Sequence, residues 1–229
     1  QWVFDNYERP DNHQMIVDLY EMASDIGRNP VLVDHSVLKK ASKTDLKARA
    51  LLNSLNGENK PICYDVWGSV TGRLTTKQGS FPIMNLKKEL ANCVVPKNNL
   101  FVQFDLNGAE IRTLLSLATG THPKEDVHEF NIKNVYRGIG TRDKAKKRFF
   151  AWLYNPNAQD HLTERFYNKT KVLKKFYSRG EVYTPFGRKI QTDDFHALNY
   201  LLQSTSSDNC MAQCAKINKF LKNTKSFVH

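Results

Sequence analysis

The sequence of 229 residues lacks any apolar run long enough to cross a membrane. A membrane-spanning helix needs about 18 consecutive apolar residues, and no segment approaches that length. The first residues, Gln1–Asp5, also lack the basic head and apolar core of a signal peptide. We therefore expect a cytoplasmic protein that is not secreted and has no membrane partner.

Cysteine is scarce, and two common motifs of phosphate-transferring enzymes are missing. The four cysteines fit neither a disulfide framework nor a CxxC zinc pair, so we expect reduced thiols packed as small hydrophobic groups: Cys63, Cys93, Cys210 and Cys214. Neither GxxxxGK[ST] nor an HRD-type loop occurs. These absences argue against P-loop and kinase-like enzymes.

Positive charge is abundant and unevenly distributed. The formal charge is +11, and residues 142–189 alone carry 13 Lys/Arg and 4 Asp/Glu, a net of +9. The other 181 residues carry only +2. Such a concentration is typical of a surface that binds a polyanion, although a solvated helix face is the alternative. The hydrophobic content of 40% suffices for a packed interior of one large or two small cores.

The hydrophobic periodicity predicts an α+β fold. We expect helices at Thr44–Leu55, at Asp126–Tyr136, at Arg142–Tyr154, at Ala158–Tyr177 and at Phe195–Leu221, and a further helix after Asn107-Gly108 in which Ile111, Leu114, Leu115 and Ala118 lie at helical spacing. We expect short strands at Ile62–Trp67 and Leu100–Asp105, a hairpin at Val182–Ile190, and a further strand where the chain ends.

Asp105 stands at the end of the predicted strand Leu100–Asp105, where a loop leads into a helix. A carboxylate there is suited to Mg²⁺, which takes one or two carboxylates together with phosphate oxygens. Glu110 follows at the start of the helix. As alternatives, Asp105 would cap the helix and Glu110 would interact with its dipole.

One face of the predicted helix Arg142–Tyr154 combines cations with aromatic rings. Arg142, Lys146, Phe150 and Tyr154 recur every four residues and span about 18 Å along the helix. Cations occupy the first half of this row and aromatics the second, as phosphates and base do in a nucleoside triphosphate. We call these four residues the row. The alternative is an ordinary amphipathic helix with solvated cations.

Together these segments resemble the family A DNA polymerases, the group that includes bacterial repair polymerases and phage replicases. Residues 104–112 read Phe-Asp-Leu-Asn-Gly-Ala-Glu-Ile-Arg, similar to the family's Asp-x-x-x-x-Glu-x-Arg motif. The row is similar to the family's nucleotide-binding fingers helix. Residues 71–76 resemble its Thr-Gly-Arg-Leu-Ser-Ser segment, and Asn85 follows.

Three later segments continue the resemblance, and they follow in the same order as in the family. The resemblance thus covers residues 61–229. Later palm motifs of the family are matched by Phe-Gly-Arg at residues 186–188 and then by Asn199-x₃-Gln203 and Asp208. Residues 227–229 resemble the opening of a Val-His-Asp-Glu motif. The resemblance implies a right-hand polymerase with an antiparallel palm sheet, mostly helical fingers and a partial helical thumb. We expect a partial thumb at 1–60, palm at 61–122, fingers at 123–190 and palm again at 191–229.

The resemblance also implies roles in template-directed DNA synthesis. Asp105 and the carbonyl of Leu106 would bind the two Mg²⁺ ions of the complete enzyme, and Glu110 would exclude the ribose 2′-hydroxyl. Arg142 and Lys146 would hold the dNTP triphosphate, and Lys146 would also protonate the departing pyrophosphate.

The same resemblance assigns the pocket and the DNA contacts. Phe150 would flank sugar and base, and Tyr154 would guard the template side of the pocket. Contacts with primer-template DNA would come from Arg73, Asn85, Arg188, Asn199, Gln203 and His229. We expect a monomeric catalytic fragment from a bacterium or a phage-infected cell.

Several positions depart from the family pattern. Asn155 replaces a glycine, Gly108 and Met84 replace glutamines, and two extra residues separate Arg73 from Asn85. The sequence stops before the Asp-Glu pair of the last motif, so we expect these 229 residues alone not to polymerise.

Two rival functions remain open at this point. A single-subunit RNA polymerase shares the palm and a similar helix, but Glu110 would block the 2′-hydroxyl of its own substrate. The second rival is a nucleic-acid-binding module without catalysis.

Overall fold

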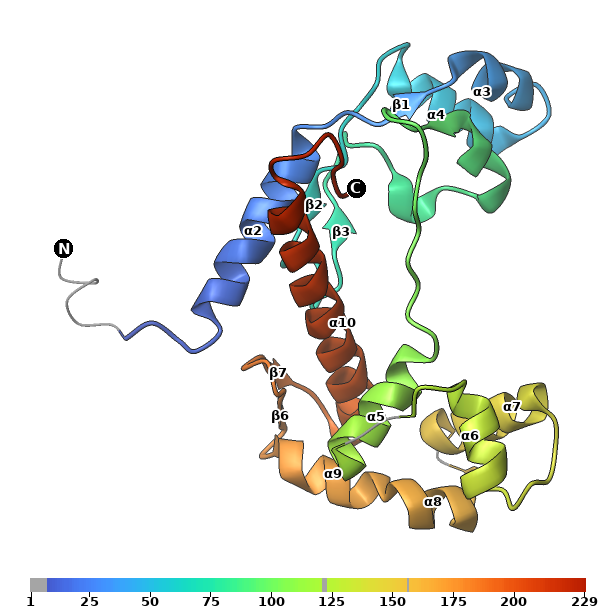
Figure 1. The fold of residues 1–229 in the computed structure, drawn as a ribbon, viewed down its shortest axis with the longest axis vertical. Coiled ribbons are helices and arrows are strands. Elements are labelled where there is room, and N and C mark those ends of the chain that lie inside the picture. The colour runs from blue at the N-terminus through green and yellow to red at the C-terminus, as the bar shows by residue number, and fades with distance from the viewer. Residues whose placement is uncertain (1–7, 121–122, 156) are drawn as a thin grey trace. The chain divides into compact units, whose positions relative to one another are not determined.

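The computed structural model describes residues 8–120, 123–155 and 157–229 as a mixed α+β protein, mostly helical with small antiparallel sheets (Figure 1). Two compact units are present: residues up to Gln103 together with Asp208–His229, and residues Phe104–Ser207. Residues 1–7, 121–122 and 156, which belong to the predicted regions 1–60, 61–122 and 123–190, lie outside the described residues. The four-part division into thumb, palm and fingers stays a prediction.

The first unit, residues 8–103 and 208–229, is built from helices and two small sheets. Its elements are α2 (His13–Gly27), β1 (Leu32–Val33), α3 (His35–Ala41), α4 (Leu46–Leu55), β2 (Tyr64–Asp65), β3 (Thr75–Thr76), η1 (Ile83–Asn85), η2 (Lys88–Cys93) and β4 (Val94–Val95). β1 pairs antiparallel with β4, and β2 with β3. Asp34 and Asp45 cap α3 and α4 through their side chains.

The second unit, residues 104–207, carries the predicted nucleotide-binding helix. Its elements are α5 (Ala109–Thr119), α6 (Val127–Asn134), α7 (Arg142–Tyr154), α8 (His161–Tyr167), α9 (Lys169–Phe176), β5 (Tyr177–Ser178), β6 (Glu181–Tyr183), β7 (Lys189–Gln191) and the first part of α10 (Asp194–Leu221). Phe149, Trp152 and Tyr167 lie in its core. The Tyr167 hydroxyl donates to Asn131 Oδ1 at 2.6 Å inside this core.

Most of the predicted elements of the second unit are confirmed. Helix α7 has the predicted bounds, and α10 begins one residue before its prediction. The predicted hairpin is β6 and β7, in which Val182 pairs with Ile190. In α7 the buried side chains recur at helical spacing, and in the hairpin the turn residues Pro185-Phe186-Gly187 mark the reversal, and both are signals that a sequence shows directly.

The single basic helix predicted at Ala158–Tyr177 is wrong. Two helices, α8 and α9, replace it, and they meet at Asn168. Asn168 adopts the left-handed conformation (φ 49°), and its side chain accepts a hydrogen bond from the Lys171 N–H at 3.0 Å. Asparagine tolerates this conformation better than most residues because its short side chain bonds to nearby backbone.

The strand predicted at Leu100–Asp105 is also wrong. The segment has no secondary structure, and four of its apolar side chains, Leu100, Phe101, Val102 and Phe104, are at least half exposed. A strand needs a neighbour for its backbone groups, and none of the described strands pairs with it. For the same reason the chain end is not a strand, and Ile62–Trp67 shrinks to the two residues of β2.

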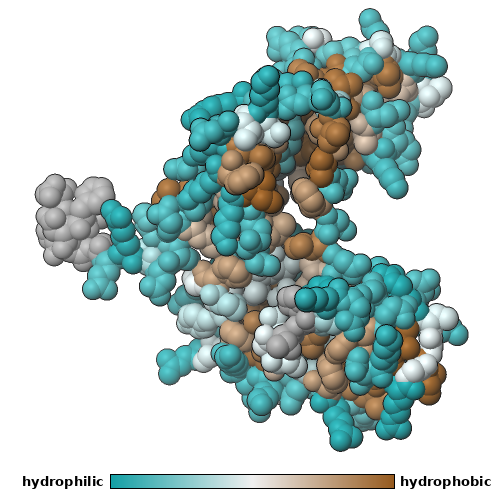
Figure 2. Space-filling model, viewed as in Figure 1, coloured by the Kyte–Doolittle hydropathy of each residue, from teal (hydrophilic) through white to brown (hydrophobic). Residues whose placement is uncertain are grey.

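The surface and the cysteines agree with the composition. Hydrophilic side chains cover most of the face seen in Figure 2. Within the described residues, no helix combines the length and apolar character needed to cross a membrane. The four cysteines are free thiols, and Cys93 is fully buried, as expected for small hydrophobic side chains.

Candidate functional site

Helix α7 presents three of the four residues of the row to solvent, and the fourth, Phe150, packs partly against the core. Thr141 caps the helix by accepting a bond from Lys144 N–H at 3.4 Å. Ala145, Phe149, Trp152 and Leu153 fill the buried side. In the row, Arg142, Lys146 and Tyr154 are exposed and Phe150 is partly buried. The cationic half is therefore accessible to a polyanion.

The aromatic half of the row forms a stacked pair. The rings of Phe150 and Tyr154 lie 6.0 Å apart between centroids with 13° between their planes. Offset stacking of this kind fixes the orientation of both rings. A flat ring of a ligand would thus meet a pre-oriented aromatic surface.

A hydrogen bond joins the end of the row to the acidic residue singled out on α5. The Tyr154 hydroxyl donates to Glu110 Oε2 at 2.6 Å, although 44 residues separate the two in sequence. Glu110 lies in the first turn of α5, where a negative charge is favourable. Two candidate residues chosen from separate motifs are thus in direct contact.

The other end of the row contacts an aspartate that sequence reasoning missed. Arg142 Nη2 lies 2.8 Å from Asp126 Oδ2. Asp126 also caps α6 by accepting from the backbone N–H groups of His128 and Glu129 at 3.0 and 3.1 Å. The hydrogen bond from Arg142 and those from the backbone hold the pKa of Asp126 far below its usual range, although burial raises it. The carboxylate is ionised at neutral pH.

His128 is a second residue that the sequence did not reveal. It is buried, its Nδ1 atom has no hydrogen-bond partner, and its ring lies 6.3 Å from that of Phe150. Burial lowers the pKa of His128 because the charged imidazolium is poorly solvated there. An unsatisfied buried nitrogen is rare in native proteins. The only sequence signal was a histidine two residues after a helix cap.

The loop that bears Asp105 lies beside the cationic end of the row. Asn107 Nδ2 lies 3.4 Å from Asp126 Oδ2, and Asp105 is two residues earlier. Asp105 and Leu106 are exposed in a loop instead of at a strand end. The loop therefore approaches Asp126, the partner of Arg142.

The described residues contain no cluster of three or more side chains able to hold a metal ion. Asp105 offers one carboxylate and Leu106 one carbonyl. This donor set suits Mg²⁺ only where phosphate oxygens and water complete the coordination. The residues therefore fit a metal that arrives with a phosphate ligand, and not a metal held by protein alone.

Three predicted DNA contacts also lie in the second unit. Arg188 stands in the turn between β6 and β7, where its N–H donates to Thr184 Oγ1 at 3.1 Å. Asn199 and Gln203 lie one turn apart on α10, and Gln203 Nε2 donates to Asn199 Oδ1 at 2.9 Å. The hairpin and the helix thus fix the backbone from which these side chains extend.

The remaining predicted DNA contacts belong to the first unit. The Arg73 carbonyl accepts from Ser69 Oγ at 2.9 Å, and Asn85 ends η1. The His229 ring is half-buried near Phe101 and Phe227, and burial lowers its pKa. The assignment of these three residues remains a prediction.

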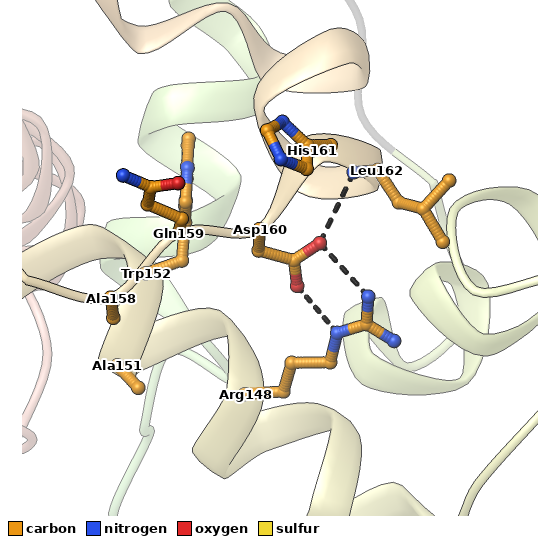
Figure 3. A pocket seen from close by; sticks show the side chains of 8 residues that line it. All are labelled: Arg148, Ala151, Trp152, Ala158, Gln159, Asp160, His161 and Leu162. Atoms are coloured by element: carbon orange, nitrogen blue, oxygen red, sulfur yellow. Dashed lines mark hydrogen bonds and ion pairs between the residues drawn. The ribbon is translucent and has the colours of Figure 1, made fainter.

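A cavity of about 390 Å³ lies beside α7 but does not involve the row. It is lined by Arg148, Ala151, Trp152, Ala158, Gln159, Asp160, His161 and Leu162 (Figure 3). An ion pair between Arg148 and Asp160 occupies one side of it. This cavity was not foreseen from the sequence.

Comparison with known proteins adds no assignment: neither a family model nor a curated protein matches the chain.

Proposed function

We propose that this chain forms the nucleotide-binding part of a family A DNA polymerase with right-hand architecture. Such an enzyme transfers dNMP from a dNTP to a primer 3′-hydroxyl and releases pyrophosphate. The observation that carries the proposal is the hydrogen bond between Tyr154 and Glu110. It joins the fingers-like row to the Asp-x-x-x-x-Glu segment, as a shared nucleotide pocket requires.

The row has the chemistry that a triphosphate needs. Phosphoryl transfer requires little covalent chemistry from the protein and depends on alignment and positive charge around the phosphates. Arg142 binds phosphate oxygens through its guanidinium, and Lys146 supplies a second cation and a proton for the leaving pyrophosphate. Phe150 and Tyr154 orient the base and sugar by stacking.

Glu110 gives the site its preference for deoxyribose. Its carboxylate is held by Tyr154 at 2.6 Å, so the side chain cannot swing away freely from the pocket. A ribose 2′-hydroxyl would compete for this space, whereas a deoxyribose would not. This contact favours a DNA polymerase over a single-subunit RNA polymerase.

Asp105 and the carbonyl of Leu106 would hold Mg²⁺ together with the substrate phosphates. A bound Mg²⁺ supplies charge neutralisation and activation of the primer hydroxyl. The residues of the chain itself do the rest: they hold the triphosphate, orient the base and exclude the ribose.

Primer-template DNA is the expected macromolecular partner. The net charge of +9 over residues 142–189 supplies the electrostatic attraction for phosphates. Arg188, Asn199 and Gln203 would contact the duplex from the second unit, and Arg73, Asn85 and His229 from the first.

The central test is primer extension by the full-length gene product with Lys146→Ala and Lys144→Ala. Both lysines are exposed on α7, but only Lys146 belongs to the row. We expect Lys146→Ala to reduce kcat by about a hundredfold and Lys144→Ala to reduce it by less than about twofold. Equal effects would contradict the assignment of the row.

Two further variants separate the rivals. Glu110→Ala should admit rNTPs that the wild type rejects; a wild type that already prefers rNTPs would indicate an RNA polymerase. Asp105→Ala should abolish extension and leave DNA affinity unchanged. Extension that survives Asp105→Ala would contradict the metal assignment and leave a non-catalytic binding module as the better interpretation.

A further inference from the structure

Two aspartates that cap helices also pair with arginines of α7, on different faces of that helix. Asp126 caps α6 and pairs with Arg142. Asp160 caps α8 and pairs with Arg148 beside the cavity (Figure 3). Only Arg142 belongs to the row, so the two pairs differ in their relation to the proposed triphosphate site.

The carboxylate of Asp126 divides its two oxygens between two tasks. Oδ1 accepts from the backbone N–H groups of His128 and Glu129 at the start of α6. Oδ2 faces Arg142 Nη2 at 2.8 Å and Asn107 Nδ2 at 3.4 Å. Because the helix backbone fixes Oδ1, the direction of Oδ2 is fixed as well.

The loop before Asp126 is anchored independently. Arg112 on α5 donates from Nη1 to the Pro123 carbonyl, and from Nη2 to the Glu125 carbonyl at 2.7 Å. Its Nε donates to the Asn107 carbonyl at 2.8 Å. Asp126 therefore stands on a support that is tied to α5 and does not depend on Arg142.

Arg142 keeps most of its hydrogen-bonding capacity while it contacts Asp126. The contact uses Nη2, and a guanidinium has five N–H donors in total. Its side chain is 43% exposed, so ligand oxygens can reach it. An unrestrained exposed arginine loses much rotamer freedom on binding a ligand, and the pair with Asp126 removes part of that loss in advance.

We propose that Asp126 is a positioning residue that holds the Arg142 guanidinium ready to receive the triphosphate of a nucleotide. This inference rests on the proposed function. Asp126 does not touch the ligand, and it acts through Arg142. A carboxylate so placed also repels phosphate, so the sign of the effect of its removal is decisive. Positioning predicts weaker nucleotide binding without Asp126, whereas masking of Arg142 predicts tighter binding.

The test is equilibrium dialysis of dTTP with Mg²⁺ against the 229-residue chain carrying Asp126→Asn. Asparagine retains the helix cap but removes the charge that holds Arg142. We expect the Kd for dTTP to rise about fivefold. The control Asp160→Asn removes the charge that holds Arg148 through two hydrogen bonds on another face of α7, and its Kd should change by less than about twofold. An unchanged or lower Kd with Asp126→Asn would overturn the proposal.

Arg142→Ala separates the failure of this inference from that of the proposed function. If Arg142→Ala leaves the Kd for dTTP unchanged, the row does not bind nucleotide and the proposed function fails. If Arg142→Ala weakens binding and Asp126→Asn does not, only the positioning role fails. Adding Asp126→Asn to Arg142→Ala should cause no further loss, since Asp126 acts through Arg142; an additional loss would contradict this route.

The kinetics of the full-length gene product distinguish a positioning role of Asp126 from a role in stability alone, because positioning changes the KM for dNTP and leaves kcat unchanged. Asp126→Asn should raise the KM for dNTP about fivefold and change kcat by less than about twofold, because the interaction is made with the bound ground state as well as with the transition state. A fall in kcat with unchanged KM would contradict the proposal. Thermal unfolding of each variant provides the folding control.

Discussion

Helix α7 has two faces that are held by different kinds of contact. On the buried face Phe149 packs against Phe150, Trp152 and Tyr167, with ring centroids 5.1 to 5.6 Å apart. On the face that bears the row, Phe150 packs partly against the core, and the exposed residues Tyr154 and Arg142 make polar contacts with Glu110 of α5 and Asp126 at the start of α6. The buried face therefore sets the position of the helix, and the polar contacts set only the orientation of side chains.

This difference has a functional consequence. Exposed ion pairs and hydrogen bonds contribute about 0–1 kcal/mol each, whereas a buried aromatic side chain contributes about 3–5 kcal/mol. A ligand can thus bind the exposed side chains of the row without disturbing the packing that holds the helix. The proposed site combines a rigid support with weak polar contacts.

The largest expected loss of stability comes from removing a side chain on the buried face of α7. Phe149→Ala should lower the free energy of unfolding by about 3–5 kcal/mol, because Phe149 is fully buried. Phe150→Ala, one residue along the helix and only partly buried, should cost less than half as much. Urea unfolding of both variants measures the difference. Equal losses would show that the two faces are not distinct.

The sequence predicted the second unit better than the connections between its parts. The periodicity of residues 142–154 sufficed for the bounds of α7 because core side chains recur at helical spacing. The break at Asn168 was missed because the basic and apolar pattern continues through it, and only the left-handed conformation of one residue separates α8 from α9. Apolar content at Leu100–Asp105 was mistaken for a strand, since composition does not reveal whether a pairing partner exists.

The candidate site was predicted in part. Spacing by four placed Arg142, Lys146, Phe150 and Tyr154 on one face, which is a local property of a helix. The contacts of this face were not predictable, since Asp126 is close to Arg142 only through the packing of α6 against α7.

The next largest loss of stability is expected where α5 and α6, the two helices that contact the row, meet each other. Gly108, the N-cap residue of α5, has φ 62°, and a Cβ there would lie 2.8 Å from Val127 Cγ1 in α6 and 2.9 Å from Ile111 Cγ2. Gly108→Ala should lower the free energy of unfolding by about 2 kcal/mol, since strain and overlap add. Gly120→Ala, at the other end of α5 with φ 77° and open space, should cost about 1 kcal/mol.

Urea unfolding midpoints of the two glycine variants measure this difference. A smaller loss for Gly108→Ala than for Gly120→Ala would mean that α6 does not press on α5 at Val127. This comparison tests the difference between the two faces of α7. Gly108→Ala disturbs α6, whose cap residue Asp126 contacts Arg142, and leaves the buried face of α7 intact.

Acid should weaken the polar contacts selectively. The hydrogen bond from Arg142 is the main cause of the lowered pKa of Asp126. Because the folded pKa lies below the unfolded value of about 3.9, the pair stabilises the protein above about pH 4, and this stability is lost as pH falls toward the folded pKa. Asp126→Asn should therefore show a shallower loss of stability between about pH 5 and pH 2 than wild type.

Unfolding midpoints measured in urea at several pH values test this expectation, with Asp160→Asn as the comparison. Burial raises the pKa of Asp160, but the hydrogen bonds from Arg148 and Thr163 outweigh it, so that its pKa is also lowered. Both variants should flatten the acid limb of the curve. A curve for Asp126→Asn parallel to that of wild type would contradict an ion pair at Arg142.

The smallest expected effect is the loss of one hydroxyl from the row. Tyr154→Phe removes the hydrogen bond to Glu110 and retains the ring stacked on Phe150. The free energy of unfolding should fall by about 0.5 kcal/mol, whereas Leu153→Ala, on the buried face one residue earlier, should cost about 2–5 kcal/mol. Urea unfolding gives both values. A loss above about 2 kcal/mol for Tyr154→Phe would mean that this contact holds the helix in place, which would contradict the contrast between the two faces of α7.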